Sequence, residues 1–468
     1  MKPFPLARSL SVALATLLAG ALVGCGAMPA PTTAPTPPPR PKPTFWVTSP
    51  TESSRSLQVE ATAAAAAPGG TADVRVDPTQ VHQVWWGTGA AMTDSSVELL
   101  EDRPGLLKAL YDPAAAKGAH LNMLRLPLSA TDFSRTPWTW SWDSVSATPT
   151  PEARRAIALV KSGVLPLRPS LRVVGAAWSA PASLKSGSSV RGGALVPGDE
   201  TSYADLLVAQ ARWLSRHGLP LWATSLGNEP GHSSDYPSMT MTDAQMSALG
   251  TAVGPRLDAL GTRLWAVDHN WYDRDRVDAV LAGSAGFDGA AFHCYAGQPG
   301  QMAGLGVPRM VTECTGTTDG AVGTFGWDAK NLVADSINAG SSGLMMWNLA
   351  LDPSHGPVDP ATRGGCGQCR GVLTVTPTGA IREPEFYTLA HLSRAASPGA
   401  HVVSVTGPPW LSVAAFRNPD GTFGVFGQSR SSVTQTVRLA VGSRAGRTYE
   451  VRPGEMFSYR APLPTGGA

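Results

Sequence analysis

Two segments of the chain share one pattern of hydrophobic and polar positions. Residues 221–230 and 307–314 each contain an apolar run that leads to a glutamate, Glu229 in the first and Glu313 in the second. Short apolar runs that close on a polar residue are typical of buried parallel strands. The pattern therefore predicts interior strands of an α/β barrel, where side chains from several strands converge at the carboxyl ends.

Eight such segments follow one another, separated by amphipathic stretches with helical spacing. The predicted helices include residues 203–214, with apolar positions three and four apart, and 327–339, which Gly340 terminates. A strand and helix repeated eight times predict a (β/α)8 TIM barrel of the α/β class. The eight predicted strands end near Gly89, Pro127, Trp178, Glu229, Asn270, Tyr295, Glu313 and Leu349.

The pattern changes near residue 397. Short alternating runs, separated by turn signals such as residues 418–421, predict a small β-sandwich to which an N-terminal strand is added. The predicted organisation is a signal segment over 1–25, a Pro/Ala/Thr-rich tether over 26–70, the N-terminal strand of the sandwich over 71–82, the catalytic barrel over 83–397 and the C-terminal β-sandwich over 398–468.

The amino terminus has the layout of a bacterial export signal. Lys2 and Arg8 precede an apolar run that is too short to favour a permanent membrane span. The run ends in Leu22-Val-Gly-Cys25, which resembles the lipobox, whose cysteine becomes lipidated; an ordinary signal peptide with an unrelated cysteine is the alternative. We expect an exported lipoprotein, held on the membrane by the lipid on Cys25 and facing the periplasm or the cell exterior.

Composition excludes several classes of protein. The formal net charge is +2 and charged residues make up 15% of the chain, so we expect no basic stripe and no nucleic-acid partner. No motif suggests a metal or a nucleotide cofactor, and we expect neither. We expect the protein to be a monomer.

Cys25 is one of five cysteines, and the other four form an even set. In an exported protein two disulfides are the usual outcome. Cys366 and Cys369 are close enough for a local clip, while Cys294 and Cys314 each adjoin a candidate site residue. A zinc site is the alternative, but only one Cys-x-x-Cys is present and no His pair accompanies it. The predicted pairing is Cys294–Cys314 and Cys366–Cys369.

Glu229 and Glu313 are candidates for a facing pair of carboxylates, the minimum equipment for hydrolysis of a glycosidic bond. One carboxyl group needs a raised pKa and the other must stay ionised, so their surroundings must differ. Arg125, at the end of a predicted strand, is suited to keep Glu313 charged. A structural ion pair at the barrel rim is the alternative role for this arginine.

Motifs of matching order and spacing cover nearly the whole barrel: Gly89-Ala-Ala-Met-Thr-Asp-Ser-Ser96, Leu124-Arg-Leu-Pro-Leu-Ser-Ala-Thr-Asp-Phe-Ser134, Ala177-Trp-Ser-Ala-Pro181, Ser225-Leu-Gly-Asn-Glu-Pro-Gly-His232, Asp268-His-Asn-Trp271, Phe292-His-Cys-Tyr295, Thr312-Glu-Cys314 and Trp347-Asn-Leu-Ala-Leu-Asp352. On these motifs the chain resembles glycoside hydrolase family 30, which includes glucosylceramidases and β-1,6-glucanases. The resemblance implies a (β/α)8 barrel with a side β-sandwich built from both ends of the domain.

The resemblance also implies catalytic roles. Glu229 would be the general acid/base and Glu313 the nucleophile of a retaining mechanism. Asn228 would bond the 2-hydroxyl of the sugar, and Tyr295 would orient Glu313.

Further residues match positions that bind the sugar. Asp94 and Trp178 would contact the outer hydroxyls of the non-reducing unit, with core packing as the alternative for Trp178. His293 and Tyr295 would face the cavity because they alternate with a cysteine that faces the helices. Trp347 would form the cavity floor.

The predicted function is hydrolysis of β-glucosidic bonds with retention, with a β-1,6-glucanase as the first choice. A glucosylceramidase-like or exo-acting β-glucosidase is the alternative, because the family pattern is altered at residues 87–91 and at Gly227. A catalytically inactive, carbohydrate-binding lipoprotein could keep this barrel, but both glutamates, Arg125 and Asn228 are present. A mannanase, xylanase or cellulase of the wider barrel clan would share the glutamates without the other motifs.

Overall fold

The computed structural model describes residues 42–317, 320–442 and 444–464, which belong to one compact unit, Pro41–Ala468. Cys25, the predicted signal segment and the first part of the predicted tether lie outside the described residues. Within the described ranges, no helix combines the length and the apolar character that crossing a membrane requires.

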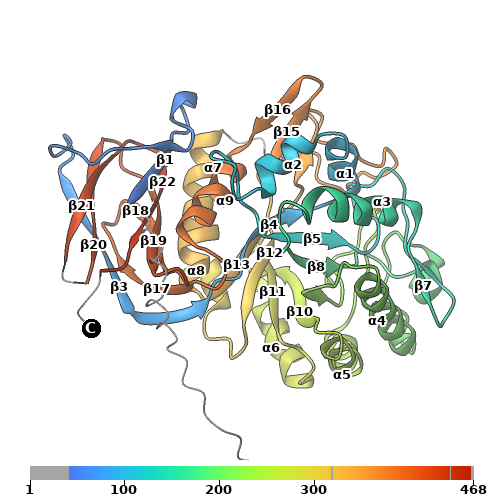
Figure 1. Ribbon diagram of the computed structural model, residues 1–468. Coiled ribbons are helices and arrows are strands. Elements are labelled where there is room, and N and C mark those ends of the chain that lie inside the picture. Colours follow the sequence, from blue (N-terminus) through green and yellow to red (C-terminus); the bar gives the residue numbers. More distant parts are fainter. Residues whose placement is uncertain (1–41, 318–319, 443, 465–468) are drawn as a thin grey trace, which may run out of the picture. The chain divides into compact units, whose positions relative to one another are not determined.

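Eight parallel strands close into a barrel, which confirms the predicted TIM-barrel fold (Figure 1). Strands pair in chain order, and the last pairs with the first to close the circle. Their apolar runs suit this position, since one face of each strand is buried in the barrel and the other beneath the helices. The strands are β4 (Gly87–Ala91), β5 (Met123–Pro127), β8 (Arg172–Ala176), β9 (Ala223–Ser225), β10 (Arg263–Asn270), β11 (Gly289–His293), β12 (Arg309–Glu313) and β13 (Ser341–Met346).

Aromatic side chains pack inside the barrel. Trp86, Trp222 and Trp265 contact one another with ring centroids 5.1 to 5.6 Å apart. Met310 and Met345 pack in the same interior cluster. This filling makes the barrel interior a solid core, so a ligand of the barrel would bind at the strand ends and not within it.

Helices surround the barrel between successive strands (Figure 1). α7 continues into a wider π-helical turn, η7 (Asp328–Asp335), and the connection from β11 to β12 holds only the 3-10 turn η6 (Pro299–Met302). The α-helices are α1 (Asp94–Leu100), α2 (Pro104–Tyr111), α3 (Pro151–Leu159), α4 (Glu200–Arg216), α5 (Asp243–Asp258), α6 (Arg274–Gly283), α7 (Ala321–Trp327), α8 (Ser336–Asn338) and α9 (Pro384–Ala395).

A separate nine-stranded sheet is built from both ends of the described chain, in the order β2-β1-β22-β19-β18-β17-β3-β20-β21. Phe45 of β1 stacks on Tyr449 of β21 at 4.2 Å between ring centroids, although these strands lie near opposite ends of that order. The sheet therefore folds over itself around a core of its own, as in a sandwich. Its strands are β1 (Thr44–Thr48), β2 (Gln58–Val59), β3 (Thr71–Val84), β17 (His401–Thr406), β18 (Leu411–Arg417), β19 (Thr422–Ser429), β20 (Gln435–Val441), β21 (Arg444–Val451) and β22 (Met456–Pro462).

The predicted tether boundary at residue 70 is wrong. β1 lies inside the tether range and pairs antiparallel with β22 along its whole length. Phe45 and Val47 are fully buried in the sheet core, so this short alternating run contributes to folding despite its low-complexity flanks. The predicted strand over 71–82 extends to Val84.

The sheet and the barrel meet at α9. His391 of α9 is buried and bonds Thr48 of β1 through Nε2 (2.8 Å) and Ser458 of β22 through Nδ1 (3.0 Å). Burial holds its pKa well below the usual value, so the ring joins these elements as a neutral group.

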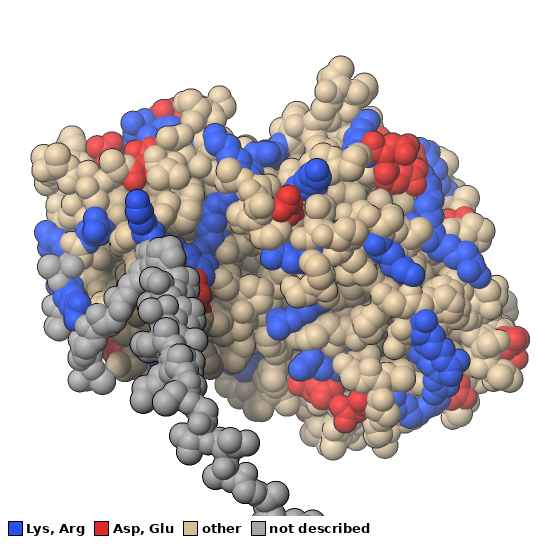
Figure 2. Space-filling model, in the orientation of Figure 1, with Lys and Arg blue, Asp and Glu red and all other residues tan. Residues whose placement is uncertain are grey.

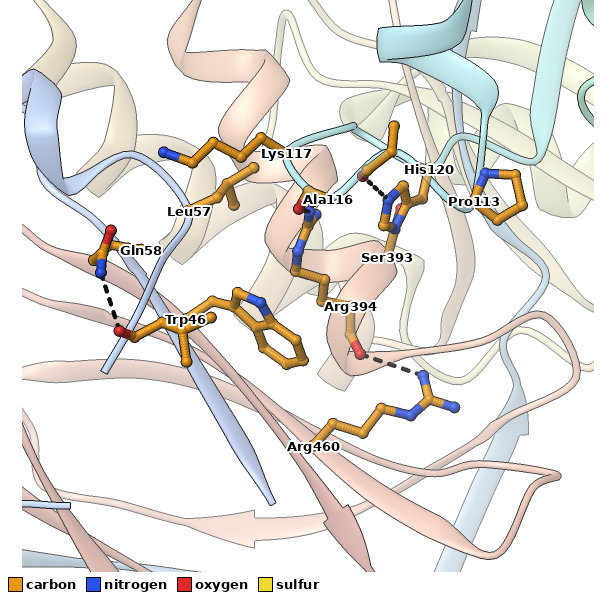
Figure 3. A pocket seen from close by; sticks show the side chains of 12 residues that line it. Trp46, Leu57, Gln58, Pro113, Ala116, Lys117, His120, Ser393, Arg394 and Arg460 are labelled. Atoms are coloured by element: carbon orange, nitrogen blue, oxygen red, sulfur yellow. Dashed lines mark hydrogen bonds between the residues drawn. The ribbon is translucent and has the colours of Figure 1, made fainter. Parts of the chain in front are cut away.

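Smaller sheets and a groove complete the structure. β14 (Ala350–Leu351), β15 (Leu373–Thr376) and β16 (Gly379–Arg382) form one sheet, and β6 (Ser141–Trp142) and β7 (Ala147–Thr148) another. A cavity of about 560 Å³ is lined by Trp46, Arg394 and other side chains of the sheet and of the nearby helical segments (Figure 3). Arg394 donates to the carbonyls of Gly118 (2.9 Å) and Ala116 (2.8 Å). Its guanidinium therefore links α9 to the segment that follows α2.

Candidate active site

The two predicted catalytic glutamates lie at the carboxyl end of the barrel, at the ends of strands that β10 and β11 separate. Glu313 is the last residue of β12, and Glu229 follows β9 with a left-handed backbone (φ 45°). The Glu229 N–H donates to the carbonyl of Asp268 (3.0 Å), which holds this unusual conformation. An oxygen of each carboxyl group lies within 4.8 Å of the other. This spacing suits a retaining pair, since inverting pairs need about 6.5–9.5 Å.

Arg125 and Tyr295 hold the carboxylate of Glu313. Arg125 of β5 is fully buried; its Nη1 donates to Glu313 Oε2 and its Nη2 to Asn228 Oδ1 (2.8 Å). The hydroxyl of Tyr295 donates to Glu313 Oε1 (2.8 Å). These donors fix the position and orientation of the Glu313 carboxylate, as a nucleophile requires.

A buried carboxylate that the sequence analysis did not select, Asp268, stands behind these groups. It accepts from Arg125 Nη2 (3.0 Å), Ser225 Oγ (2.6 Å) and Thr312 Oγ1 (2.6 Å). The nearby Arg125 and His293 hold the pKa of Asp268 far below its usual value despite burial. The sequence could have indicated Asp268, because this residue is the first of the Asp268-His-Asn-Trp271 motif.

His293 bridges two carboxylates. Its Nδ1 lies 2.9 Å from Glu229 Oε1, and its Nε2 lies 3.1 Å from Asp268 Oδ1. Glu313, Asp268 and Glu229 together raise the pKa of His293 to about 10 against the opposing effect of burial. His293 is therefore an imidazolium at neutral pH and donates to both carboxylates.

This cation changes the expected acid/base electrostatics. Burial favours a protonated Glu229, but the hydrogen bond and charge of His293 outweigh it and lower the pKa of Glu229. The raised pKa expected for the acid/base is therefore not found at Glu229. Because the two side chains share a hydrogen bond, the proton that the reaction needs is held by the His293–Glu229 pair.

We expect stability to fall as the pH rises from about 6.5 to about 10. The raised pKa of His293 makes the folded state bind its proton more tightly, so this stabilisation is complete below pH 6.5 and is lost through about pH 10. One proton gives a slope of up to about 1.4 kcal/mol per pH unit. Urea unfolding at stepped pH should show this slope in the wild type and in the control variant His82→Gln, because His82 is exposed. The same slope in His293→Gln would contradict the assignment.

Glu229, His293 and Glu313 also form the donor set of a possible metal site, with ligand atoms within 4.8 Å of one another. A metal needs a free imidazole lone pair. Both nitrogens of His293 already face carboxylate oxygens, so this donor set fits a hydrogen-bonded cation better than a metal ligand.

A cavity of about 310 Å³ opens over the glutamates. Trp178 and Trp347 stack along one side with ring centroids 5.0 Å apart, and the Arg125 guanidinium lies 4.7 Å from the Trp178 ring. Trp178 is thus both packed and part of the cavity wall. The cavity is lined by Asp132, Trp178, Asn228, Glu229, Tyr236, Tyr295, Glu313, Thr315, Thr317, Trp347, Gly364, Gly365, Cys366 and Cys369.

Asp94 is not among the residues that line this cavity, and its predicted sugar contact stays a prediction. It begins α1, and its carboxylate accepts from the indole N–H of Trp138 (2.7 Å). Asp132, which belongs to the motif Leu124–Ser134, does line the cavity. Burial and the charge of Glu313 raise the pKa of Asp132 to about 7, so this carboxyl group can donate as well as accept hydrogen bonds near neutral pH.

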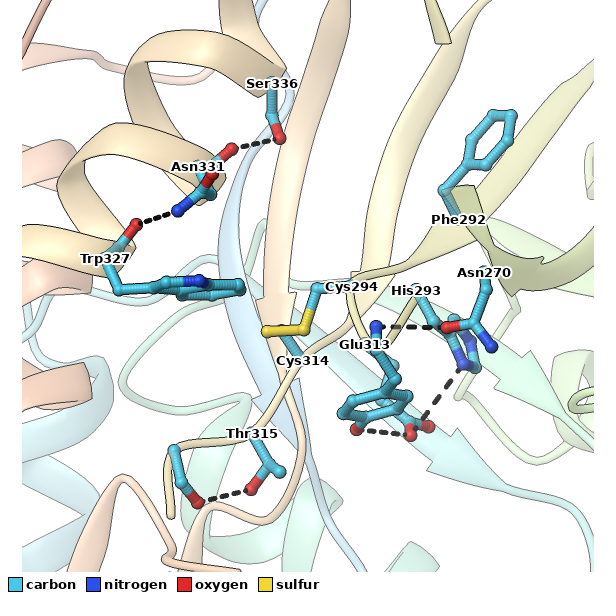
Figure 4. Close-up of a disulfide and its surroundings, with 12 residues drawn as sticks. Asn270, Phe292, His293, Cys294, Glu313, Cys314, Thr315, Trp327, Asn331 and Ser336 are labelled. Atoms are coloured by element: carbon cyan, nitrogen blue, oxygen red, sulfur yellow. Dashed lines mark hydrogen bonds and ion pairs between the residues drawn. A yellow bond between two sulfur atoms is a disulfide. The ribbon is translucent and has the colours of Figure 1, made fainter. Parts of the chain in front are cut away.

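The four remaining cysteines are joined as Cys294–Cys314 and Cys366–Cys369, the expected pairing. The first bond ties the residue after β11 to the residue after β12, directly beside Glu313 (Figure 4). The second closes a turn that lines the catalytic cavity.

Replacing Cys294 and Cys314 together by Ala is expected to lower the free energy of unfolding by about 3 kcal/mol, because the cross-link spans 20 residues. Activity should fall as well, since Glu313 would lose its fixed position. The pair Cys366 and Cys369, only three residues apart, gives the matched control with a smaller loss of stability. Denaturant unfolding measures both, and two or more titratable thiols in the denatured, unreduced wild type would contradict the pairing.

Comparisons with known proteins agree with this architecture. Residues 86–284 match the model of the Glycosyl hydrolase family 30 TIM-barrel domain. An Aspergillus fumigatus protein named Endo-1,6-beta-D-glucanase neg1 is 27% identical over 425 residues, covering 80% of this chain and 82% of its own. The Mus musculus lysosomal acid glucosylceramidase is 24% identical, covering 76% and 77%.

A solved structure titled the endo-beta1,6-glucanase BT3312 superposes with a TM-score of 0.80. It is 23% identical in sequence, and the match covers 90% of this chain and 100% of that one. This likeness supports the fold of both the barrel and the side sheet.

Proposed function

We propose that this chain, whose residues 86–284 match the glycosyl hydrolase family 30 TIM-barrel model, is a retaining glycoside hydrolase that cleaves β-1,6-linked glucan. The observation that carries the proposal is the pair of strand-end carboxyl groups, Glu229 and Glu313, with oxygens within 4.8 Å of each other. The two lie in different surroundings, as a division of roles requires. Glu313 accepts hydrogen bonds from Arg125 and Tyr295, whereas Glu229 shares a hydrogen bond with His293.

In the first step Glu313 attacks the anomeric carbon while Glu229 delivers a proton to the departing oxygen. Substrate binding displaces water and brings the glycosidic oxygen to Glu229, and the proton held on His293 can move along the hydrogen bond to the carboxyl group. The product is a glycosyl ester of Glu313 and a free sugar hydroxyl. Asn228, oriented by Arg125, is placed to bond the 2-hydroxyl, a contact that strengthens in the transition state.

In the second step water replaces the departed sugar. Glu229 takes the proton from the water, the new bond forms at the anomeric carbon, and the ester bond to Glu313 breaks. Two inversions restore the β configuration. Arg125 and Tyr295 then hold Glu313 as a carboxylate again.

The cavity supports a glucosyl unit at the reacting position. The stacked Trp178 and Trp347 offer an apolar wall to a ring with equatorial substituents, and Asp132 is placed to bond outer hydroxyls. A sugar with an axial 4-hydroxyl would leave a buried polar group partly unpaired, at a cost of about 1–3 kcal/mol. Relatives named as endo-1,6-beta-D-glucanases support the β-1,6 linkage, and those named as glucosylceramidases support the same glucosyl unit on another leaving group.

We also propose export and lipid anchoring through Cys25. The signal-like amino terminus supports export, and the two disulfides are the bonds expected of an oxidising compartment.

On the face shown in Figure 2, basic side chains are scattered and interspersed with acidic ones rather than gathered in a stripe.

Product analysis of the purified soluble domain tests the proposed function. We expect cleavage of pustulan, a β-1,6-glucan, and little or none of laminarin, a β-1,3-glucan. An aryl β-glucoside and a glucosylceramide in detergent serve as the alternative substrates. Activity on xylan or β-galactosides without activity on any β-glucoside would overturn the substrate and leave the retaining mechanism open to its own test.

A further inference from the structure

A second cavity, of about 580 Å³, adjoins the catalytic one. The two share Tyr295, Thr315 and Thr317 in their linings. Trp178 and Trp347, the wall of the catalytic cavity, do not line the second one. The second cavity therefore meets the catalytic one at Tyr295 and the two threonines, and not at the wall that receives the reacting sugar.

Trp327, the last residue of α7, lines this second cavity and is 42% exposed. Figure 4 shows its indole ring beside the Cys294–Cys314 disulfide, and Cys294 lines the same cavity. The flat apolar face of the indole, next to a rigid cross-link, can receive the C–H face of a sugar ring.

The rest of the lining suits an uncharged, hydroxylated ligand. Hydroxyl groups border the platform at Thr315 and at Thr324, whose Oγ1 accepts from Arg370 (3.1 Å). Among the described residues of the lining there is no Lys, Arg or His, and the single acid, Asp328, is buried with its carboxyl group bonded by Thr388 (2.9 Å). An anionic ligand would find no countercharge here, whereas a neutral sugar needs none.

We infer that this cavity is the subsite for the sugar on the leaving-group side of the scissile bond, with Trp327 as its stacking platform. The inference rests on the proposed function, because it assigns the reacting sugar to the Trp178–Trp347 wall. A β-1,6 linkage adds the C6 methylene and one more rotatable bond between the rings. The departing ring can therefore turn away from the axis of the reacting sugar and reach a platform set to the side, beyond Tyr295.

The same subsite must receive the acceptor when a sugar instead of water resolves the glycosyl–enzyme intermediate. In that step the O6–H of the acceptor gives its proton to Glu229, its oxygen bonds to the anomeric carbon, and the ester bond to Glu313 breaks. The ratio of transfer to hydrolysis therefore reports occupation of this cavity independently of the donor side.

The test compares Trp327→Ala with the wild type on two substrates. β-Gentiobiosyl fluoride loses only a fluoride ion and cannot use the platform, whereas pustulan loses a sugar. We expect Trp327→Ala to lower kcat/KM for pustulan about tenfold, mainly through KM, and to leave the fluoride unchanged. With gentiobiose as acceptor, the transfer-to-hydrolysis ratio should fall by a similar factor, and Trp327→Phe should restore part of both.

Tyr272→Ala is the matched control, because Tyr272 is 52% exposed but lines neither cavity. It should leave both substrates and the transfer ratio unchanged. Equal losses on fluoride and pustulan in Trp327→Ala, or unchanged values on both, would overturn the platform while leaving the proposed function in place. A wild type that cleaves neither substrate would overturn the proposed function and this subsite together.

Discussion

Replacing Glu313 by Ala is expected to lower kcat on β-1,6-glucan by about 10⁴-fold or more, because no other group can form the glycosyl ester. The carboxylate is held by Arg125 and Tyr295, and the space that it leaves is large enough for a small anion. With a β-glycosyl fluoride as donor, added azide should attack from that space and give an α-glycosyl azide. Product analysis by proton NMR measures both the azide and the configuration at the anomeric carbon.

The matched control for this variant is Glu98→Ala. Glu98 is a glutamate of α1 whose side chain is 33% exposed and paired with Arg135. It should keep the wild-type kcat and the wild-type product. Net inversion of configuration by the wild type would contradict a nucleophilic Glu313, whatever the size of the loss in the variant.

Replacing Glu229 by Ala should separate substrates according to their leaving groups. Proton transfer by a positioned acid contributes about 10²–10⁴-fold, so kcat/KM for β-1,6-glucan, whose leaving group is an alcohol, should fall by that factor. A β-glycosyl fluoride needs less protonation and should form the intermediate at a nearly unchanged rate. Azide should then speed turnover and give a β-glycosyl azide, because Glu313 remains in place.

The pH dependence of the same variant checks the role of the His293–Glu229 pair. The limb of the pH–rate profile that reports loss of the catalytic proton should disappear in Glu229→Ala. Glu229→Gln, which keeps the hydrogen bond to His293 without a titratable proton, is the conservative control. Equal losses on glucan and on the fluoride, with no response to azide, would assign the acid/base role elsewhere.

The amino-acid sequence by itself determined the barrel, its catalytic end and the two glutamates. Each barrel strand is a local apolar run, and burial on both faces gives that run a distinct signature. Because the carboxyl ends of parallel strands meet, residues 84 positions apart such as Glu229 and Glu313 were expected to face one another. The pairing of Cys294 with Cys314 could be predicted for a similar reason, since these cysteines follow neighbouring strands.

Only the tertiary structure decided which polar residues of the motifs reach the cavity and what charge they carry. Asp94 and Asp132 both lie in motifs, but Asp94 turns to Trp138 and only Asp132 lines the catalytic cavity. The charge of His293 depends on three carboxyl groups from three other strand ends, so no local pattern could predict the imidazolium or the lowered pKa of Glu229. β1 was hidden for the same reason: its five residues become a strand because β22, some 400 positions later, offers an edge to pair with. Local patterns fix where burial occurs, whereas pairing and electrostatics depend on distant groups that only the folded chain brings together.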